Sequence, residues 1–549
     1  MKSSRLRIAL ELLCVAVLCA IAFWATRDHA RGDTATSDEP LHIFAAAEYV
    51  KNGTYVTNPE HPPLTKDLAG LALGSVISPR ITRIAPIQEL PEMRGFLEKN
   101  RISSDELFAR GRAPFRWLLV LLIVTVYLGA RVSFGSGAAF LAAAIVALDP
   151  IFIAHAGVIH TDVAAALFIT ATLLVAIHAQ HSALRWLLTG LLLGLALLAK
   201  FSAILIVPLV MLAPLLVPRA RLQAFAGAAV ACIVALVVVF AGYAVNMRSM
   251  PPIVAARASA AFLLSRQCDR DTVLRYAHFT ERFPPAGMFV TGIKGVAQTS
   301  AHDRGWNFLH GRISKRGFPS YFFIAFAIKS TPAFLLLAAA ALFGSRDRRV
   351  LVLLIPVAVI FAASVPSSFN IGVRHILPIY PFLAIAGAGI LATRLPQRAF
   401  AVAALLLVIS AAVSLAHIHP FELGYFNALV KGYEGGEEWL SDSNIDWGQD
   451  VGRLDDLLRA RGWTDTHIIV FANMALWPRI ERYPPLQPGT IRPGRYAVSS
   501  YMEHAGPQFV REYEGEEAGK MMTELVEALH TRGKVVARAG ASIKVWELR

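Results

Sequence analysis

The chain has 549 residues, of which 55% are hydrophobic, and its mean hydropathy is +0.51. These values exclude an ordinary soluble domain and predict a polytopic membrane protein with some water-exposed parts. The formal charge of +14 does not indicate a nucleic-acid partner, because much of the Lys and Arg lies in short loops between apolar runs. The 4 cysteines make neither a disulfide framework nor a Cys-rich metal site, since three of them lie inside apolar runs.

About eleven apolar runs predict transmembrane helices. The first, from Ile8 to Ala25, is long enough to span, so we expect an uncleaved first span rather than a signal peptide. The fifth and sixth runs are separated only by Lys200, which suits two short helices with a turn at one face. The runs lie at roughly 8–25, 115–131, 137–156, 162–180, 184–199, 201–217, 223–246, 319–343, 350–365, 374–392 and 399–417.

Basic residues between the runs set the predicted orientation. They include Lys2, Arg5, Arg131, Arg185, Arg221, Arg346 and Arg394, all on one side of the predicted bilayer. This side is cytoplasmic, so we expect a multi-pass protein of the cell inner (plasma) membrane with a cytoplasmic N-terminus and an extracytoplasmic C-terminus.

The chain divides into a transmembrane domain, residues 1–418, and an extracytoplasmic tail, residues 419–549. Large external loops lie at 26–114 and 247–318 of the transmembrane domain. The first loop contains an amphipathic helix from Leu41 to Lys51. The tail alternates predicted helices at 447–462 and 521–531 with predicted strands at 467–471, 495–499 and 543–548, which indicates a small α/β domain.

Two acidic motifs fall on the external side of this topology. Asp38 and Glu39 follow the first run, and His160 and Asp162 lie between two later runs. Carboxylates beside a membrane face are costly to bury and usually functional, so we expect them to meet in one reaction centre. The alternative is that Asp38 and Asp162 are helix caps, which is common for Asp before a helix.

A proline-rich turn in the first loop displays Glu60, His61 and Lys66 close together. Such a set could bind a sugar, a phosphate or a metal, although two ligands without a third at useful spacing predict a metal only weakly. The alternative is a rigid surface turn.

Cations also gather at the external boundary. Lys200, Arg374 and His375 could hold a phosphate leaving group, or they could extend to lipid headgroups. Lys329 lies deeper in an apolar run and needs a carboxylate or phosphate partner. A further polar motif, Asp442 to Asp450, contains Trp447 and could touch sugar hydroxyls, but a turn before a helix explains it as well.

These motifs together resemble those of the C-type, polyprenyl-phosphate-dependent glycosyltransferases, and more closely the bacterial relatives of the protein O-mannosyltransferases of glycosyltransferase family 39. The matching segments begin with Asp38-Glu39-Pro40 and Asn58-Pro59-Glu60-His61-Pro62-Pro63. Further matches are Leu198-Ala199-Lys200-Phe201, Lys329-Ser330-Thr331-Pro332, Asn370-Ile371-Gly372-Val373-Arg374-His375, Tyr425-Phe426-Asn427 and Asp442-Ser443-Asn444-Ile445-Asp446-Trp447-Gly448-Gln449-Asp450.

The resemblance implies roles for particular residues. Asp38 matches the catalytic base, with Glu39 beside it, and Asp162 matches a second acidic residue that lines the site. The family takes a sugar from a polyprenyl carrier and inverts the anomeric centre. We therefore expect transfer of mannose, or of another hexose or pentose, to a protein, lipid or glycan acceptor. The substrate-binding residues would be Glu60, His61, Lys66, His160, Lys200, Lys329, Arg374 and His375.

No cofactor is required by this chemistry, because a phosphate-activated sugar already has a good leaving group. A divalent cation held by Glu60 and His61 together with distant residues stays open. Two alternative functions also stay open: a lipid or solute transporter, for which Lys329 is the one midplane candidate, and a membrane-anchored sensing protein whose tail does the work.

Overall fold

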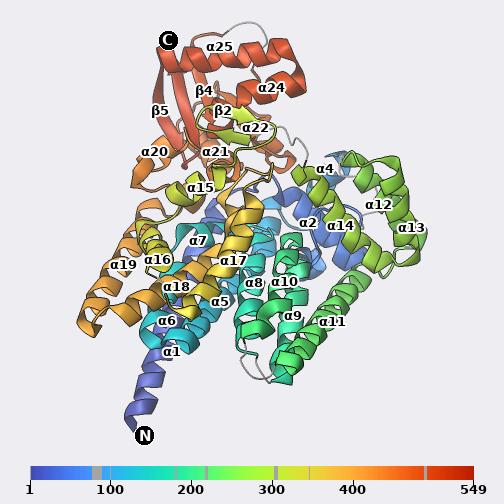
Figure 1. Cartoon of the computed structure of the whole chain (residues 1–549). Helices are drawn as coiled ribbons and strands as arrows, with labels where there is room; N and C mark the ends of the chain where they lie inside the picture. Colours follow the sequence, from blue (N-terminus) through green and yellow to red (C-terminus); the bar gives the residue numbers. More distant parts are fainter. Residues whose placement is uncertain are drawn as a thin grey trace.

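A computed structural model shows a layer of helices with a small sheet at one end (Figure 1). The structure describes residues 2–76, 90–98, 100–179, 182–216, 221–301, 307–344, 346–486 and 491–549. The first helix begins at the end of the layer opposite the sheet, and the C-terminus lies beside the sheet. The predicted helical membrane protein with a small C-terminal α/β region is confirmed, whereas its orientation in the bilayer stays a prediction.

Four of the helices within the described ranges are long and apolar enough to cross a membrane. Many of their large apolar side chains are exposed, among them Trp24, Leu236 and Val402, as expected for helices that face lipid. The predicted number of about eleven spans is not confirmed as a count, because most of the remaining apolar helices are shorter or broken. The long helices are α1 (Lys2–Gly32), α5 (Ser104–Phe134), α11 (Arg221–Asn246) and α19 (Gln397–Ile418).

Several predicted spans are broken. The run at 137–156 bends by 58° at Leu148-Asp149, and the run at 319–343 is interrupted at Ser330-Thr331 before Pro332. The predicted break at Lys200 is confirmed, since Lys200 has an extended backbone between a helix and a 3₁₀ turn. These elements are α6 (Ser136–Ala147), α7 (Pro150–Ala156), α8 (Asp162–Ile177), α9 (Ala183–Ala199), η3 (Phe201–Ile206), α10 (Val207–Leu212), η4 (Ala213–Leu216), α15 (Tyr321–Lys329), α16 (Pro332–Phe343), α17 (Arg348–Ser364), η5 (Val373–Ile376) and α18 (Ile379–Arg394).

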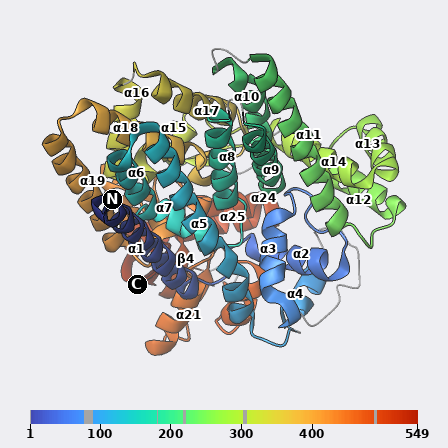
Figure 2. The ribbon, with the colours of Figure 1, turned by 90° about the horizontal axis from the view of Figure 1, so that it is seen from below.

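The two large loops form short helices beside the main layer, and Figure 2 shows them as two groups. The predicted helix Leu41–Lys51 is confirmed, although it begins at Glu39 and its last turn is π-helical. The first group is α2 (Glu39–Ala47), η1 (Glu48–Asn52), α3 (Leu64–Leu73), η2 (Gly74–Val76) and α4 (Leu90–Glu98). The second is α12 (Pro252–Ser265), α13 (Arg270–Arg282) and α14 (Pro284–Ala301), followed by the hairpin β1 (Asn307–Leu309) and β2 (Arg312–Ser314).

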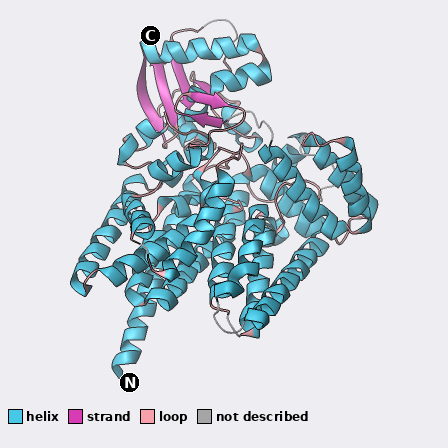
Figure 3. Cartoon of the chain, in the orientation of Figure 1, coloured by secondary structure: helices cyan, strands magenta, loops and turns pink. Residues whose placement is uncertain are grey.

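The tail begins with short helical turns and ends in a four-stranded sheet, the larger of the two sheets in Figure 3. These turns are η6 (Glu422–Gly424), η7 (Ala428–Val430), α20 (Tyr433–Gly436) and η8 (Asp442–Asn444). The strand order is β3-β4-β6-β5, with β3 parallel to β4 and the other pairs antiparallel. The strands are β3 (His467–Ile469), β4 (Gly494–Ser499), β5 (Gly533–Ala539) and β6 (Ile543–Leu548), and the helices among them are α21 (Val451–Ala460), α22 (Trp477–Ile480, after the turn η9, Met474–Leu476), α23 (Ser500–His504), α24 (Gly506–Glu514) and α25 (Glu516–Arg532).

The three predicted strands are present, and β5 was not predicted because Gly-Lys-Val-Val-Ala-Arg-Ala does not alternate polar and apolar residues. The predicted helix at 447–462 is shorter, since residues 442–450 form turns instead. Those turns are hydrogen-bonded to Ser37, before α2, and to Val373, at the start of η5.

Candidate functional site

Asp38 occupies the N-cap position of α2, but its carboxylate makes no capping hydrogen bond. It faces inward instead: Oδ2 lies 3.6 Å from Nε2 of His160 and 3.6 Å from Nη2 of Arg374. The Asp38 side chain is still 39% exposed, so it can be reached from outside the cluster. Capping therefore does not explain this residue, and its carboxylate is available to a substrate.

His160 and Asp162 lie beside Asp38 at the start of α8. Nδ1 of His160 is 2.7 Å from Oδ2 of Asp162, and Nζ of Lys200 donates to Oδ1 of the same carboxylate at 2.6 Å. The Asp162 carboxylate is fully buried and contacts both Lys200, at the α9–η3 break, and His160, which lies beside Asp38. It acts on the site through these two partners.

Arg374 reaches the same cluster from η5. Its Nη1 lies 2.7 Å from Nε2 of His160 and 3.8 Å from Oδ2 of Asp162. The Arg374 guanidinium also stacks on the Trp447 ring, with 4.2 Å from Cζ to the ring centroid. Cations over a buried indole face are held in one orientation, and Trp447 is only 2% exposed. The tail thus supplies one wall of the site.

The charges around Asp38 keep its carboxylate ionised. Burial alone would raise its pKa, but the hydrogen bond from His160 and the charges of Arg374, His160 and His42 hold the pKa of Asp38 well below its ordinary value. Asp38 is therefore an anion at every physiological pH. A carboxylate with so low a pKa is also a weak base.

Glu39 has a different environment, although it is the next residue. Its carboxylate accepts hydrogen bonds from Nε of Arg112 at 2.7 Å and from the backbone N–H groups of Thr36 and Ile159. Burial would raise the pKa of Glu39, and the ion pair with Arg112 lowers it instead. With 1% of its side chain exposed, Glu39 has no open access to a substrate.

The proline-rich turn places its three predicted binding residues unequally. Glu60 is paired with Arg266 of the second large loop. Nζ of Lys66 is buried and donates to the carbonyls of His61 and Pro62, at 3.2 and 3.4 Å, which stabilises the turn. Burial lowers the pKa of Lys66 to about 7, although Glu60 and Asp67 partly oppose this. The turn directs His61 toward His160.

His61 also lines a cavity of about 190 Å³, together with Lys200 of the cluster. The polar lining residues include Lys200 and His375, and the rest of the wall is mostly apolar. Its other lining residues are Glu60, Phe201, Ser202, Leu205, Val296, Ser300, Phe322, Ala363, Ser364, Ser367 and Phe369. The lining thus combines charged groups, Glu60 among them, with a largely apolar surface.

Lys329 lies apart from these residues. Its ammonium is buried, donates to the carbonyls of Leu423 and Asn444, and lies 4.3 Å from the ring centroid of Phe426. The predicted carboxylate or phosphate partner is replaced by these backbone oxygens. Lys329 therefore connects the broken helix α15 to the beginning of the tail.

Three histidines could hold a metal ion. The ligand atoms of His42, His61 and His160 all lie within 4.8 Å of one another. The pair weighed from the sequence, Glu60 and His61, is a poorer candidate because the Glu60 carboxylate is engaged by Arg266.

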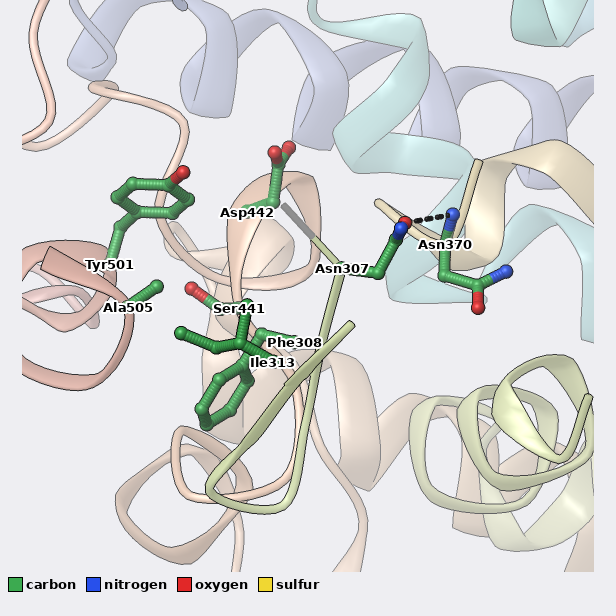
Figure 4. A pocket seen from close by; sticks show the side chains of 8 residues that line it. All are labelled: Asn307, Phe308, Ile313, Asn370, Ser441, Asp442, Tyr501 and Ala505. Carbon is green, nitrogen blue, oxygen red and sulfur yellow. Dashed lines mark hydrogen bonds between the residues drawn. The ribbon is translucent and has the colours of Figure 1, made fainter. Parts of the chain in front are cut away.

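A second hollow lies between the β1–β2 hairpin and the tail (Figure 4). It is lined by Asn307, Asn370, Asp442 and Tyr501, among others, and Asn370 N–H donates to Oδ1 of Asn307 at 2.8 Å. Its volume of about 10 Å³ accommodates roughly one water molecule. The hollow is too small for a sugar and is not a candidate substrate site.

Sequence reasoning gave no separate role to three residues of this region. His42 lies four residues after Asp38, so helical spacing puts both on one face, a signal that was present. Trp447 was noted, but nothing in the sequence places it on Arg374. Arg112 gave no signal, because its partner Glu39 is 73 residues away.

The sequence comparison agrees with the motifs. Residues 105–243, about a quarter of the chain, match the family described as dolichyl-phosphate-mannose-protein mannosyltransferase. No protein of curated function matches the sequence. The protein is thus a multi-pass membrane protein that resembles the C-type polyprenyl-phosphate-dependent glycosyltransferases. Within that class, the resemblance is to the protein O-mannosyltransferases.

Three solved structures to which this chain is similar are as follows. ArnT from Cupriavidus metallidurans bound to undecaprenyl phosphate is 14% identical, with 97% of each chain covered and a TM-score of 0.47. AglB from Archaeoglobus fulgidus, with an inhibitory peptide and a dolichol-phosphate, is 14% identical over 98% of this chain and 74% of that one, with a TM-score of 0.46. The Saccharomyces cerevisiae Pmt1–Pmt2 complex bound to its sugar donor is 19% identical over 45% and 35%, with a TM-score of 0.36.

Proposed function

We propose that this protein is an inverting membrane glycosyltransferase that moves a sugar from a polyprenyl-phosphate carrier to a hydroxyl on an extracytoplasmic acceptor. The observation that carries the proposal is the position of Asp38. Its accessible carboxylate lies beside His160 and Arg374, which contact Asp162, and Asp162 is bonded to Lys200 at the mouth of an apolar cavity. A proton acceptor and a lipid-phosphate site are thereby neighbours.

The cavity supports a polyprenyl phosphate as the donor. Lys200 would receive the phosphate as a cation, His61 and His375 would donate hydrogen bonds to it, and the apolar residues of the lining would receive the first prenyl units. Cations that already face the leaving phosphate stabilise the charge that develops on it, without reorganisation during the reaction. Arg374 lies between the two parts of the site and would contact the sugar phosphate from the Asp38 side.

Asp38 would accept the acceptor proton. The acceptor oxygen bonds to the anomeric carbon from the face opposite the phosphate, the carbon–phosphate-oxygen bond breaks, and its electron pair leaves with the lipid phosphate. Because such a transition state is oxocarbenium-like, the hydroxyl becomes acidic only as its new bond forms. A weakly basic, permanently ionised carboxylate suits that timing.

The other acidic residues would have supporting roles. Asp162 would orient His160 and Lys200, since both contact its carboxylate. Glu39 would fix the start of α2 through Arg112 and thereby set the direction of Asp38. Glu60, Lys66 and Lys329 would stabilise the walls of the site rather than touch the donor.

The sugar, mannose or another hexose or pentose, and the acceptor, a protein, lipid or glycan, follow from the family resemblance alone. Mass spectrometry of envelope proteins and lipids, with the active chain and with an inactive variant, would identify both. Loss of one hexose or pentose mass in the inactive strain names the donor sugar and the acceptor class together.

The proposal is tested with the purified full chain in vesicles and a radiolabelled polyprenyl-phosphate sugar. We expect label to pass to an acceptor with inversion at the anomeric carbon. Movement of the intact donor across the bilayer without transfer would show a transporter instead. If the donor neither moves nor transfers its sugar to any acceptor fraction of the envelope, the transferase proposal is contradicted.

A further inference from the structure

The second large loop carries an unusual charge for a segment on the predicted external side. Residues 247–318 contain 11 Lys and Arg residues against 4 Asp and Glu, a net charge of +7. Residues 26–114 of the first loop contain 11 against 12, a net charge of −1. Basic residues are expected on the cytoplasmic side, and long loops cross the membrane largely regardless of their charge. The predicted topology therefore does not account for the basic residues of the second loop.

The helices of this loop continue a span whose apolar side chains are exposed. α12 follows α11 after the short turn at 247–251, and α14 packs on both α11 and α13. Phe240 and Val245 near the end of α11 are exposed, and so is Ile253 just beyond the turn. Figure 1 and Figure 2 both show α12 and α13 at the edge of the helical layer. The exposed apolar surface of α11 thus continues into the loop.

α13 combines arginines with exposed aromatic side chains. Arg275 and Arg282, seven residues apart, lie on one face of the helix. Beside them lie Phe279 and Phe283, which are 41% and 48% exposed and have their ring centroids 5.6 Å apart. The Arg282 guanidinium lies over the Phe283 ring, 5.5 Å from its centroid. Basic groups beside exposed apolar rings are typical of a helix that lies in the membrane–water interface.

The arginines of this surface have few protein partners. Among the residues that the structure describes, Arg257, Arg270 and Arg282 form no ion pair, and Arg275 donates to the hydroxyl of Thr272 at 3.2 Å. α13 itself contains three arginines and two acidic residues, so it keeps an excess of positive charge. Exposed cations without counter-charges beside an apolar surface fit an anionic lipid.

We propose that α12 and α13 form a membrane-surface element that binds anionic phospholipid headgroups of the predicted external leaflet. The arginines would contact lipid phosphates, and Phe279 and Phe283 would insert beside the first acyl carbons. Apolar burial and electrostatic attraction to anionic lipids add together in such helices. A soluble acidic partner would not account for the exposed phenyl rings or for their continuity with a lipid-facing span.

This element is connected to the donor cavity. Val296 and Ser300 of α14 line the cavity, and Arg266 at the end of α12 is paired with Glu60 of the lining. Contact of α12 and α13 with the membrane surface would therefore hold one wall of the cavity in place.

The test measures hydrogen exchange of residues 270–283 in the purified full chain, in nanodiscs of phosphatidylcholine with and without phosphatidylglycerol. Each basic residue near an anionic surface strengthens association about fivefold, so phosphatidylglycerol should slow exchange by about 10-fold or more. Exchange of α24, in the tail, should be the same in both lipids. The triple variant Arg270→Gln, Arg275→Gln and Arg282→Gln should lose the dependence on phosphatidylglycerol.

A control triple variant removes the same charge from exposed positions of the tail. It combines Arg461→Gln, Arg532→Gln and Arg549→Gln, and it should keep the lipid dependence of the wild type. Thermal unfolding verifies that each variant is folded. Equal exchange of residues 270–283 in the two lipids, or equal loss of lipid dependence in the two triple variants, would overturn the proposal.

The aromatic part is tested separately. Phe279→Ser combined with Phe283→Ser should speed exchange of residues 270–283 in both lipids, because the apolar anchor is lost. Tyr513→Ser is the matched control, since Tyr513 is an exposed aromatic residue of the tail, and it should leave this exchange unchanged. Equal effects of the aromatic variants would contradict insertion of α13 into the membrane.

Other anions are distinguished in the same assay. Inorganic phosphate added to phosphatidylcholine nanodiscs should leave exchange of α13 unchanged. If phosphate alone slows exchange as much as phosphatidylglycerol does, or if slowing requires a soluble acidic envelope protein, the proposal is overturned. No sugar donor is present in these measurements, so their outcome is independent of the proposed transfer reaction.

Discussion

Asp38 and Glu39 show how adjacent carboxylates acquire separate tasks. Asp38 is partly accessible and faces two groups that also contact Asp162, whereas Glu39 is buried against Arg112. Nη1 of Arg112 also donates to the carbonyls of Ala30 and Asp33, so the Glu39 pair connects α2 to the end of α1. The first residue is the proposed base, and the second is held inside the fold.

Glu39→Gln should therefore lower stability strongly. It leaves the Arg112 guanidinium buried without its counter-charge, which typically costs about 3–5 kcal/mol. Denaturant titration of the detergent-solubilised protein measures this loss. Glu106→Gln is the matched control, because the Glu106–Arg110 pair is exposed and such pairs contribute about 0–1 kcal/mol. Equal, small losses in both variants would contradict the structural role of Glu39.

Glu503 makes a pH prediction for the tail. Burial would raise its pKa, but His530 at 2.8 Å and Lys544 at 2.9 Å hold the pKa of Glu503 at about 2. Because this pKa is depressed, its stabilisation is full above the ordinary value of 4.5 and is lost as the pH falls from about 4.5 to 2. The contribution is about 3 kcal/mol, since the side chain is only 4% exposed.

Acid titration with Trp546 fluorescence can follow this loss, because Trp546 lies beside both partners of Glu503. Glu503→Gln should be less stable at neutral pH and should show a shallower dependence between pH 4.5 and 2. An unchanged acid transition in this variant would mean that another group governs it.

At the scale of elements, the turn segment 442–450 connects the tail to two segments of the candidate cluster. The Trp447 carbonyl accepts the Ser37 N–H at 2.8 Å, next to Asp38. Oδ1 of Asn444 accepts the Val373 N–H at 3.0 Å, next to Arg374. This segment therefore holds the two loops at a fixed separation, in addition to stacking the Trp447 ring on the Arg374 guanidinium.

Trp447→Leu should lower turnover more than it lowers donor affinity, because Arg374 loses its support but keeps its charge. We expect a fall of about 10-fold or more in kcat, as for a misplaced electrostatic group. Steady-state transfer assays measure this. Trp463→Leu is the control, since Trp463 lies in the tail away from the cluster and contacts Arg461 and Arg495. Equal effects of the two substitutions would mean that Trp447 only stabilises the tail.

Local sequence patterns predicted these elements well and their contacts poorly. Hydrophobic periodicity predicted α2, α25 and three strands of the sheet, because the pattern that indicates each element lies within the element itself. The sequence predicts a turn before a helix that begins at Trp447, whereas residues 447–450 still belong to the turn segment, whose polar residues are bonded to loops that lie 71 or more residues earlier. Long-range partners of this kind leave no mark on local composition.

At the scale of the molecule, several breaks and helix starts lie at the cluster. Lys200 lies at the α9–η3 break, and Asp162 and Arg374 lie where α8 and η5 begin. Irregular backbone at membrane depth is tolerated where it is buried in protein or lines a cavity, and the apolar cavity begins at this place. Under the proposed function, this arrangement would give a lipid-borne substrate a lateral path to Asp38.

Filling this cavity should affect long-chain donors selectively. Val296 of α14 lines the cavity, so Val296→Trp should raise KM for a polyprenyl-phosphate sugar and leave a short-chain donor little affected. Ala297→Trp is the matched control, because Ala297 is the exposed next residue and does not line the cavity. A KM that rises equally for both donors, or in both variants, would contradict a prenyl path at this place.

The sequence placed most of the candidate cluster on one predicted side of the bilayer. It could not distinguish residues that would contact a substrate from residues that stabilise the fold. Asp38, His160, Asp162, Lys200 and Arg374 lie together, as their external positions suggested. Lys329 had the same signals, an isolated cation in an apolar run, yet its partners are backbone carbonyls. Isolated charges indicate that partners exist, and only the fold shows whether those partners are substrate or protein.

The most direct test of the account compares Asp38→Asn with Asp28→Asn in single-turnover transfer from a labelled polyprenyl-phosphate sugar. Asp28 is the control because it is exposed and pairs with His419 outside the cluster. The account predicts that Asp38→Asn lowers the transfer rate by about 10²–10⁴-fold with unchanged thermal stability, while Asp28→Asn transfers like the wild type. A folded Asp38→Asn protein that transfers sugar at the wild-type rate would contradict it.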